Sequence, residues 1–172
     1  YTYIMNILTK SSSETKNVAR RLAARVRTMR TSHVLPHALV FSLEGNLGAG
    51  KTTFTQGFAK ALGIKERVLS PTFVVLKRYA IPPRRKGVGE CLLYHIDCYR
   101  FKSTREMSQL EFKTILKDTR ALVLIEWGER VWRALPNHTL HIRFEHKGGN
   151  KRRITILNSK NPTLGMRFEK HA

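Results

Sequence analysis

The sequence predicts a three-layer α/β fold, in which a central mixed sheet has a parallel core and added antiparallel strands or hairpins. Three observations support this prediction. A short apolar run leads through a glycine-rich turn into an amphipathic helix, which is the first half of a strand–helix unit. Two later apolar runs each end in a carboxylate. Turn residues join the remaining strand-like segments into hairpins.

A single folded domain is expected over residues 1–172, with loosely ordered ends at 1–10 and 159–172. Hydrophobic residues make up 41% of the chain and charged residues 26%, a balance that supports a core and excludes a disordered chain. No apolar window is long enough to span a membrane, and no secretory signal is visible. We therefore expect a soluble, cytoplasmic protein without a membrane partner.

A helix is predicted from Ser11 to Met29. Ser11 and Glu14 form a capping-box pattern, and apolar residues recur at helical spacing along one face. The other face is basic: it carries Lys16, Arg20, Arg21, Arg25 and Arg27. An arginine-rich, acid-poor start is also typical of an organellar transit peptide, but the cap and the apolar stripe favour a structural helix.

The next unit is a strand, a turn and a helix. Leu39 to Leu43 is a continuous apolar run, typical of a strand buried on both faces. Beyond the glycine-rich turn, apolar residues from Phe54 to Leu62 recur at helical spacing. Gly63 stands where a left-handed helix cap is favoured, so the helix is expected to end there.

A hairpin is predicted in the middle of the chain, from strands at Phe73–Tyr79 and Cys91–Asp97. Its tip, Ile81–Glu90, is rich in proline, glycine and basic residues and is expected to be exposed. The only cysteines, Cys91 and Cys98, are seven positions apart in what looks like one strand and point to opposite faces. We therefore expect neither a disulfide nor a zinc site.

The C-terminal part is predicted to hold short helices and three strands. Thr104–Leu116 is expected to form one or two helices, and Glu129–Leu135 another. The strands are expected at Ala121–Ile125, His138–Phe144 and Arg153–Leu157, the last two joined by a Gly-Gly hairpin turn.

The chain is strongly basic. It has 32 Lys and Arg residues against 12 Asp and Glu residues, a formal net charge of +20. Such a charge attracts polyanions, which makes a nucleic acid, a nucleotide or an acidic protein surface a plausible partner.

The glycine-rich turn matches the P-loop pattern G-x-x-x-x-G-K-[ST]. The matching residues are Gly45, Asn46, Leu47, Gly48, Ala49, Gly50, Lys51 and Thr52. Its position between a buried strand and a helix start is the one that the phosphate-binding mechanism requires. Its glycines let the backbone wrap a phosphate, Lys51 would reach the β- and γ-phosphates, and the Thr52 hydroxyl would bind Mg²⁺. The predicted fold is therefore P-loop NTPase-like.

Hydrolysis also requires an acidic group near the phosphates. Two apolar strands end in one, at Asp97 and at Glu126, and both belong at the carboxyl edge of the sheet beside the P-loop. Either residue is a candidate for the metal shell. Thr72, in the Ser-Pro-Thr sequence after the P-loop helix, is placed like a threonine that senses the γ-phosphate and its metal.

Four motifs in order resemble those of the TsaE (YjeE) family of bacterial P-loop ATPases. They are the P-loop from Gly45 to Thr53, the sequence S-P-T-F at 70–73, the sequence H-I-D-C-Y-R at 95–100 and the sequence I-E-W at 125–127. The resemblance covers about residues 11–157. One departure is Asn46, where many family members carry Asp.

The resemblance implies binding and hydrolysis of ATP with Mg²⁺, in support of threonylcarbamoyladenosine synthesis on tRNA. The threonylcarbamoyl transfer itself would belong to the partners TsaD and TsaB, and the basic surface suggests that tRNA lies close by.

Residue roles follow from the same resemblance. It implies that Lys51 contacts the phosphates, that Thr52 and Glu126 hold Mg²⁺, and that Asp97 supports hydrolysis. The P-loop up to Thr53, Thr72 in the switch segment and Trp127 would lie at the nucleotide. Two alternatives stay open: a small-molecule or nucleoside kinase, and a nucleic-acid-binding protein that uses nucleotide as a switch.

Overall fold

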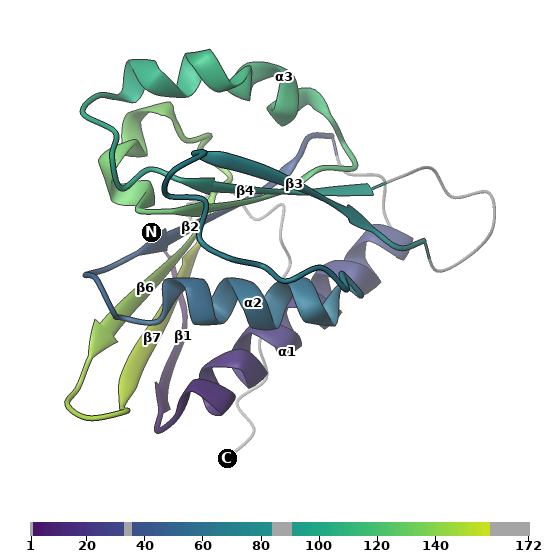
Figure 1. Cartoon of the computed structure of the whole chain (residues 1–172). Helices are drawn as coiled ribbons and strands as arrows, with labels where there is room; N and C mark the ends of the chain where they lie inside the picture. Colours follow the sequence, from purple (N-terminus) through teal and green to yellow (C-terminus); the bar gives the residue numbers. More distant parts are fainter. Residues whose placement is uncertain (1, 33–35, 84–90, 159–172) are drawn as a thin grey trace.

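A seven-stranded mixed sheet forms the centre of the molecule, with the strand order β1-β7-β6-β2-β5-β4-β3 (Figure 1). The computed structural model describes residues 2–32, 36–83 and 91–158. The strands are β1 (Thr2–Thr9), β2 (Leu39–Glu44), β3 (Leu76–Ile81), β4 (Cys91–Asp97), β5 (Leu122–Glu126), β6 (Leu140–His146) and β7 (Arg152–Asn158). The helices are α1 (Ser12–Ser32), α2 (Lys51–Ala61) and α3 (Phe112–Lys117), with 3₁₀ turns η1 (Thr104–Leu110), η2 (Gly128–Arg130) and η3 (Trp132–Ala134).

The sheet has the predicted parallel core. β2 pairs in parallel with β5 and with β6, and β5 pairs in parallel with β4. β3, β7 and β1 extend this core on its two sides through antiparallel pairings. The carboxyl ends of the four parallel strands therefore meet at one edge of the sheet, where α/β proteins bind their ligands.

Helices cover both faces of the sheet, which confirms the predicted three-layer α/β fold. α1 and α2 lie side by side on one face, and α3 lies on the other (Figure 1). The first face is packed by residues such as Leu22, Phe41 and Phe58, and the second by Tyr94, Met107 and Ile125. None of the described helices is long and apolar enough to cross a bilayer.

Close contact between α1 and α2 depends on Gly57. A Cβ atom at this position would lie 2.7 Å from the Cα of Lys16 and 2.8 Å from its carbonyl oxygen. A side chain here would push the two helices apart, because these distances are shorter than any real Cβ contact. At the other end of the pair, the Arg27 guanidinium donates to the carbonyl of Ala61, so α1 also caps α2.

The N-terminal cap of α1 is as predicted. The backbone N–H of Glu14 donates to the Ser11 hydroxyl, and a Glu14 carboxylate oxygen accepts from the backbone N–H of Lys10. These contacts satisfy backbone donors that a helix start would otherwise leave unpaired.

Residues 2–9 are not loose, contrary to the expectation for residues 1–10. They form β1, which pairs antiparallel with β7 along its length. Met5 and Ile7 are partly buried against the core. The physical reason is that backbone pairing with β7 and the partial burial of Met5 and Ile7 offset the entropy lost on ordering this segment.

The other differences from the sequence predictions are local. The segment expected to be one helix at Glu129–Leu135 forms the two 3₁₀ turns η2 and η3 instead, and the strand expected to begin at Phe73 begins at Leu76. Neither Cys91 nor Cys98 forms a disulfide among the described residues. Two predicted segments lie outside the described residues: the basic hairpin tip with Arg84, Arg85 and Lys86, and the C-terminal end 159–172.

Candidate functional site

The predicted P-loop connects β2 to α2 at the carboxyl edge of the sheet. Gly45, Gly48 and Gly50 have φ angles of +130°, +72° and +107°, in the region that favours glycine. A Cβ atom at Gly45 would lie 2.3 Å from the carbonyl oxygen of Phe144. Gly50 caps α2 without any side-chain hydrogen bond, and the first turn of α2 has no acidic residue. The positive end of α2 is therefore left available to an anion.

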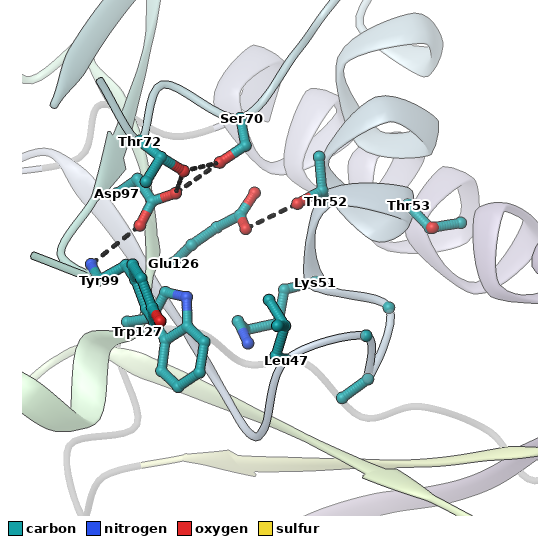
Figure 2. A pocket seen from close by; sticks show the side chains of 13 residues that line it. Leu47, Lys51, Thr52, Thr53, Ser70, Thr72, Asp97, Tyr99, Glu126 and Trp127 are labelled. Carbon is teal, nitrogen blue, oxygen red and sulfur yellow. Dashed lines mark hydrogen bonds between the residues drawn. The ribbon is translucent and has the colours of Figure 1, made fainter. Parts of the chain in front are cut away.

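A pocket of about 390 Å³ opens in front of this turn (Figure 2). The residues that line it come from the P-loop, the 70–72 segment and the ends of two strands. They are Leu47, Gly48, Ala49, Gly50, Lys51, Thr52, Thr53, Ser70, Thr72, Asp97, Tyr99, Glu126 and Trp127. Every residue predicted for the site is here except Gly45 and Asn46, which line a neighbouring hollow of about 620 Å³ beside the β6–β7 hairpin.

Lys51 is buried, and its ammonium group has no carboxylate partner within hydrogen-bonding distance among the described residues. It donates to the carbonyl oxygens of Gly45 and Asn46, the second at 3.0 Å. It also lies 3.7 Å from the centre of the Trp127 ring. Burial lowers the pKa of Lys51, although the nearby carboxylates of Glu129, Glu126 and Asp97 oppose this shift. An anion in the pocket would stabilise its charged form.

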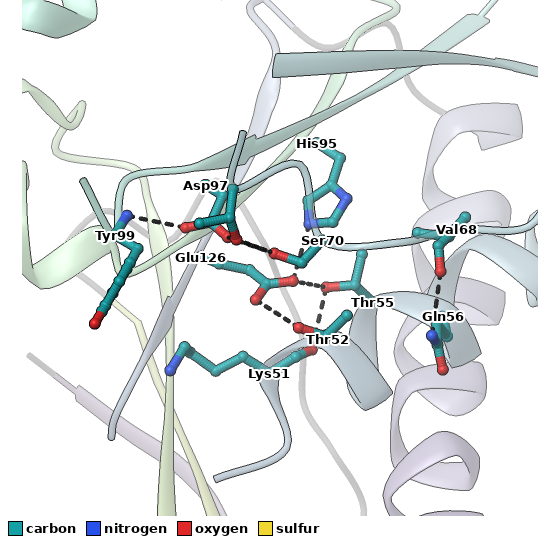
Figure 3. A network of polar contacts seen from close by, with 11 residues as sticks. Lys51, Thr52, Thr55, Gln56, Val68, Ser70, His95, Asp97, Tyr99 and Glu126 are labelled. Atoms are coloured by element: carbon teal, nitrogen blue, oxygen red, sulfur yellow. Dashed lines mark hydrogen bonds and ion pairs between the residues drawn. The ribbon is translucent and has the colours of Figure 1, made fainter. Parts of the chain in front are cut away.

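Glu126, at the end of β5, contacts the first turn of α2. Its Oε2 accepts a hydrogen bond of 2.8 Å from the Thr52 hydroxyl, and its Oε1 accepts one of 3.4 Å from the Thr55 hydroxyl (Figure 3). The parallel register places Glu126 beside Leu43, at the end of the strand that enters the P-loop. The carboxylate and the P-loop hydroxyl thus meet at the position where a P-loop protein holds its metal.

His95 holds the other side of this carboxylate, a role that the sequence analysis did not assign. Its Nε2 lies 2.9 Å from Glu126 Oε1, and the residue is fully buried. Nδ1 has no hydrogen-bond partner among the described residues. Because an ionised carboxylate only accepts hydrogen bonds, Nε2 carries the hydrogen and donates it. The sequence signal that could have identified His95 was strand alternation, because residues two positions apart in a strand, such as His95 and Asp97, lie on the same face of β4.

Asp97 makes a different set of contacts. Its Oδ2 accepts hydrogen bonds from the hydroxyls of Ser70, at 2.5 Å, and Thr72, at 2.6 Å. Its Oδ1 accepts from the backbone N–H of Tyr99 at 2.9 Å. Among the described residues no hydrogen bond joins Asp97 to Thr52. The two candidate acids are therefore distinct: Glu126 contacts α2, whereas Asp97 ties the 70–72 segment to the end of β4 (Figure 2).

Trp127 forms one wall of the pocket. It adopts a left-handed backbone conformation with φ of 61°, rare for a bulky residue. Its ring lies 5.1 Å from the Tyr99 ring, and the guanidinium of Arg130 lies 5.5 Å from its centre. Tyr99 and Ser70 therefore join the site, although the sequence analysis did not single them out.

A second buried carboxylate lies behind the P-loop, at the end of β2. Glu44 Oε1 accepts hydrogen bonds from the Ser42 hydroxyl, at 2.9 Å, and contacts His141 Nδ1 at 2.5 Å. Glu44 Oε2 accepts from Arg143 at 2.9 Å. Burial alone would raise the pKa of Glu44, but the contacts with His141, Arg143 and Ser42 outweigh it and lower that pKa. This cluster joins β2 to β6 immediately before Gly45.

The described residues contain no group of three His, Cys, Asp or Glu side chains that would hold a metal by itself. The side chains that line the pocket offer hard oxygen donors, among them the carboxylates of Glu126 and Asp97 and the Thr52 hydroxyl. Mg²⁺ is held in this way in nucleotide sites, by one or two protein oxygens together with substrate phosphates and water.

Comparison with known proteins gives one consistent family. The family model described as "Threonylcarbamoyl adenosine biosynthesis protein TsaE" matches residues 9–154. A Bacillus subtilis protein named "tRNA threonylcarbamoyladenosine biosynthesis protein TsaE" is 35% identical over 161 residues, 94% of this chain and 87% of the relative. The Treponema pallidum protein of the same name is 37% identical over 123 residues, covering 72% of this chain and 84% of the relative.

A solved structure extends the similarity to the fold. The crystal structure of Bacillus subtilis YdiB superposes with a TM-score of 0.65 and 32% identity, covering 92% of this chain and 88% of the other. The family model spans most of the sequence and the relatives cover most of its length at more than 30% identity, so the chain belongs to the TsaE family.

Proposed function

We propose that this chain binds and hydrolyses ATP with Mg²⁺ at the P-loop. It does so as an accessory protein of threonylcarbamoyladenosine synthesis on tRNA, acting with TsaD and TsaB in the cytoplasm. The observation that carries most weight is the 2.8 Å hydrogen bond between the Thr52 hydroxyl and Glu126. It joins the hydroxyl and the carboxylate that this chemistry needs, at the first turn of the helix that follows the phosphate loop.

The phosphate-binding part of the proposal is supported by the loop and by Lys51. The three glycines with positive φ let the backbone approach an anion closely. Among the described residues, the Lys51 ammonium group contacts backbone carbonyls and an aromatic ring but no carboxylate, so a phosphate oxygen would be a better partner for its charge. Binding would then draw the ammonium group away from Trp127 and the loop carbonyls.

The metal-binding part is supported by the donor set. Thr52 and Glu126 would hold Mg²⁺, with the carboxylate held in place by Thr55 and His95. When bound, the ion would neutralise charge on the phosphate oxygens. Glu126 is 2% exposed, so its orientation is set by these neighbours rather than by water.

Asp97 supports hydrolysis from the opposite wall of the pocket. It accepts hydrogen bonds from Ser70 and Thr72, whose hydroxyl oxygens lie 2.8 Å apart, and each hydroxyl oxygen has two lone pairs with which to accept a further hydrogen bond. Thr72 lines the pocket, and in this proposal its hydroxyl orients the attacking water. In this proposal Asp97 acts through the two hydroxyls as a positioning residue.

The involvement of partner proteins is supported by exposed apolar side chains near the pocket. Leu47, which lines the pocket, is 82% exposed, and Phe73 and Val74, next to Thr72, are 83% and 67% exposed. Large apolar side chains gathered on a surface are typical of protein-binding sites. TsaD and TsaB are the partners proposed to cover them.

Phosphate release tests this function. We expect release from ATP by the purified chain to be slow, and to rise at least tenfold when TsaD, TsaB and tRNA are added. Lys51→Ala should abolish ATP binding and release, whereas Asp97→Ala should keep ATP binding and slow the release. Equal rates of phosphate release by the parent chain, Lys51→Ala and Asp97→Ala would contradict the proposal. Transfer of the phosphate to a small acceptor would instead identify a kinase.

A further inference from the structure

The helical layers on the two faces of the sheet differ sharply in charge. α1 contains six basic residues and one acidic residue, Glu14 in its first turn, and α2 contains two basic residues and no acidic one. On the opposite face, the segment from Thr104 to Asp118 contains three basic and three acidic residues. Positive charge is therefore unbalanced in α1 and α2 and balanced in the segment from Thr104 to Asp118.

Three basic side chains of α1, Lys16, Arg20 and Arg21, carry charge that no described carboxylate pairs with. Arg20 and Arg21 are exposed and Lys16 is half-buried. Arg20 contacts only the neutral side chain of Asn17. Lys60, exposed on the adjacent α2, adds to the same surface. Arg27 does not belong to this surface, because its guanidinium donates to the end of α2.

The two helices present no exposed aromatic side chain on this surface, since α1 contains no Phe, Tyr or Trp and both Phe54 and Phe58 of α2 are buried. Proteins that bind single-stranded nucleic acids stack bases on aromatic rings, whereas double-helical RNA is contacted mainly through its phosphates and its shape. A rigid helix with cations along about 8 Å, from Lys16 to Arg21, and a further cation on the adjacent helix is suited to the second kind of contact.

The position of α1 connects this surface with the nucleotide site. The first turn of α1 reaches the P-loop, where the Cγ2 of Thr15 lies 3.8 Å from the Cβ position of Gly50. α1 then runs beside α2 away from the pocket (Figure 1). A partner bound along α1 would therefore lie next to the site proposed to hydrolyse ATP.

From these observations we infer that the basic face of α1, defined by Lys16, Arg20 and Arg21 with Lys60 of α2, binds the phosphate backbone of a double-helical stem of tRNA. This inference rests on the proposed function, which supplies tRNA as the RNA present. It deepens that function by assigning the RNA to one helix face, separate from the side of the sheet that carries α3.

Labelled unmodified tRNA, titrated with the full chain in the absence of nucleotide, tests the inference. Binding is measured by fluorescence anisotropy between about 50 and 200 mM salt. One triple variant carries Lys16→Gln, Arg20→Gln and Arg21→Gln. The matched control carries Arg105→Gln, Lys113→Gln and Lys117→Gln, which removes three exposed charges from the opposite face.

We expect the α1 variant to lose about tenfold or more in affinity, and its slope of log affinity against log salt to become shallower by about two to three. The control variant should stay within about twofold of the parent. The single variants Arg20→Gln and Arg21→Gln, each reducing the slope by about one, keep the test available if the triple variant does not fold.

Four outcomes would overturn the inference. They are equal losses in the α1 and control variants, no loss in either, equally tight binding of a single-stranded oligonucleotide, and retained tRNA binding with lost binding of TsaD and TsaB. The last outcome would make α1 a protein-docking face. The assay contains no nucleotide, so the tRNA affinity is measured independently of ATP binding. A chain that fails to bind ATP would contradict the proposed function, and its tRNA affinity could still be interpreted.

Discussion

At the scale of single residues, the carboxylate of Glu126 receives hydrogen bonds from three side chains on two elements. Thr52 and Thr55 donate from α2, and His95 donates from β4. With both oxygens engaged and the side chain buried, the carboxylate has one orientation. In the proposed function, this fixed anionic oxygen and the neighbouring Thr52 hydroxyl would hold the metal.

The first prediction concerns the charge of that group. Glu126→Gln keeps the size and loses the negative charge, so we expect ATP binding to persist, while phosphate release falls by about 10²- to 10³-fold and a higher Mg²⁺ concentration is needed. Phosphate release and ATP titration at several Mg²⁺ concentrations measure both effects. Glu66→Gln, an exposed carboxylate after α2, is the control and should behave like the parent. Unchanged release by Glu126→Gln would remove this residue from the mechanism.

The second prediction concerns His95 as a positioning residue. His95→Leu removes the donor to Glu126, whereas His95→Gln can place an amide N–H near the same point. We expect the Leu variant to need about tenfold more Mg²⁺ for phosphate release and the Gln variant to recover most of the loss. ATP affinity without Mg²⁺ should be the same in both. Equal behaviour of the two variants in the Mg²⁺ titration would show that His95 only fills space.

At the scale of elements, the P-loop depends on how α2 packs. α2 is held against α1 at Gly57 and against the ends of β4 and β5 through the polar contacts around Glu126. A shift of α2 would move Lys51 and Thr52 together relative to Glu126, since both belong to its first turn.

The third prediction tests this packing. In an unconstrained helix, Gly→Ala stabilises by about 1 kcal/mol. At Gly57 the added methyl group would instead overlap the backbone of Lys16, so we expect Gly57→Ala to destabilise the fold by about 1–3 kcal/mol. Urea unfolding measures the change. Lys60→Ala, on the exposed side of the same helix, should change stability by less than about 0.5 kcal/mol. A stabilised Gly57→Ala variant would show that α1 and α2 are not tightly packed there.

The fourth prediction concerns the link between β2 and β6 through Glu44. The pKa of Glu44 is lowered in the folded chain, so this carboxylate stabilises the fold above its ordinary pKa of 4.5, and the contribution is lost as the pH falls through the lowered value. We expect Glu44→Gln to be less stable than the parent by about 1–3 kcal/mol at pH 7, and the difference to shrink below pH 4.5. Urea unfolding at several pH values measures it. If the difference in unfolding free energy between the parent and Glu44→Gln grew as the pH fell, the predicted direction of the pKa shift would be wrong.

At the scale of the whole molecule, the parts of the fold that follow from neighbouring residues were predictable. The P-loop lies between an apolar strand and an amphipathic helix, and the cap at Ser11 is a local pattern, so short stretches of sequence were sufficient. The two strand-end acids were predictable for the same reason. Their distinct contacts, Glu126 with Thr52 and Asp97 with Ser70 and Thr72, depend on strand order and were not.

Long-range pairing explains the rest of the differences. β1 is stabilised by pairing with β7, which follows it by more than 140 positions. The sequence of residues 1–10 alone does not indicate that this partner strand exists. His95 was part of a motif, but its contact with Glu126 exists only because β4 and β5 are neighbours in the sheet. The basic residues of α1 could be counted from the sequence, but the position of α1 and α3 on opposite faces of the sheet became visible only in the fold.

Isothermal titration calorimetry of ATP into the full chain, with Mg²⁺ and with a chelator, tests the central claim most directly: that the P-loop binds ATP together with a metal held by Thr52 and Glu126. We predict one ATP per chain, bound at least about tenfold more tightly with Mg²⁺, and loss of that difference in Thr52→Val. A folded chain that takes up no ATP, or that binds it equally well without the metal, would contradict the claim.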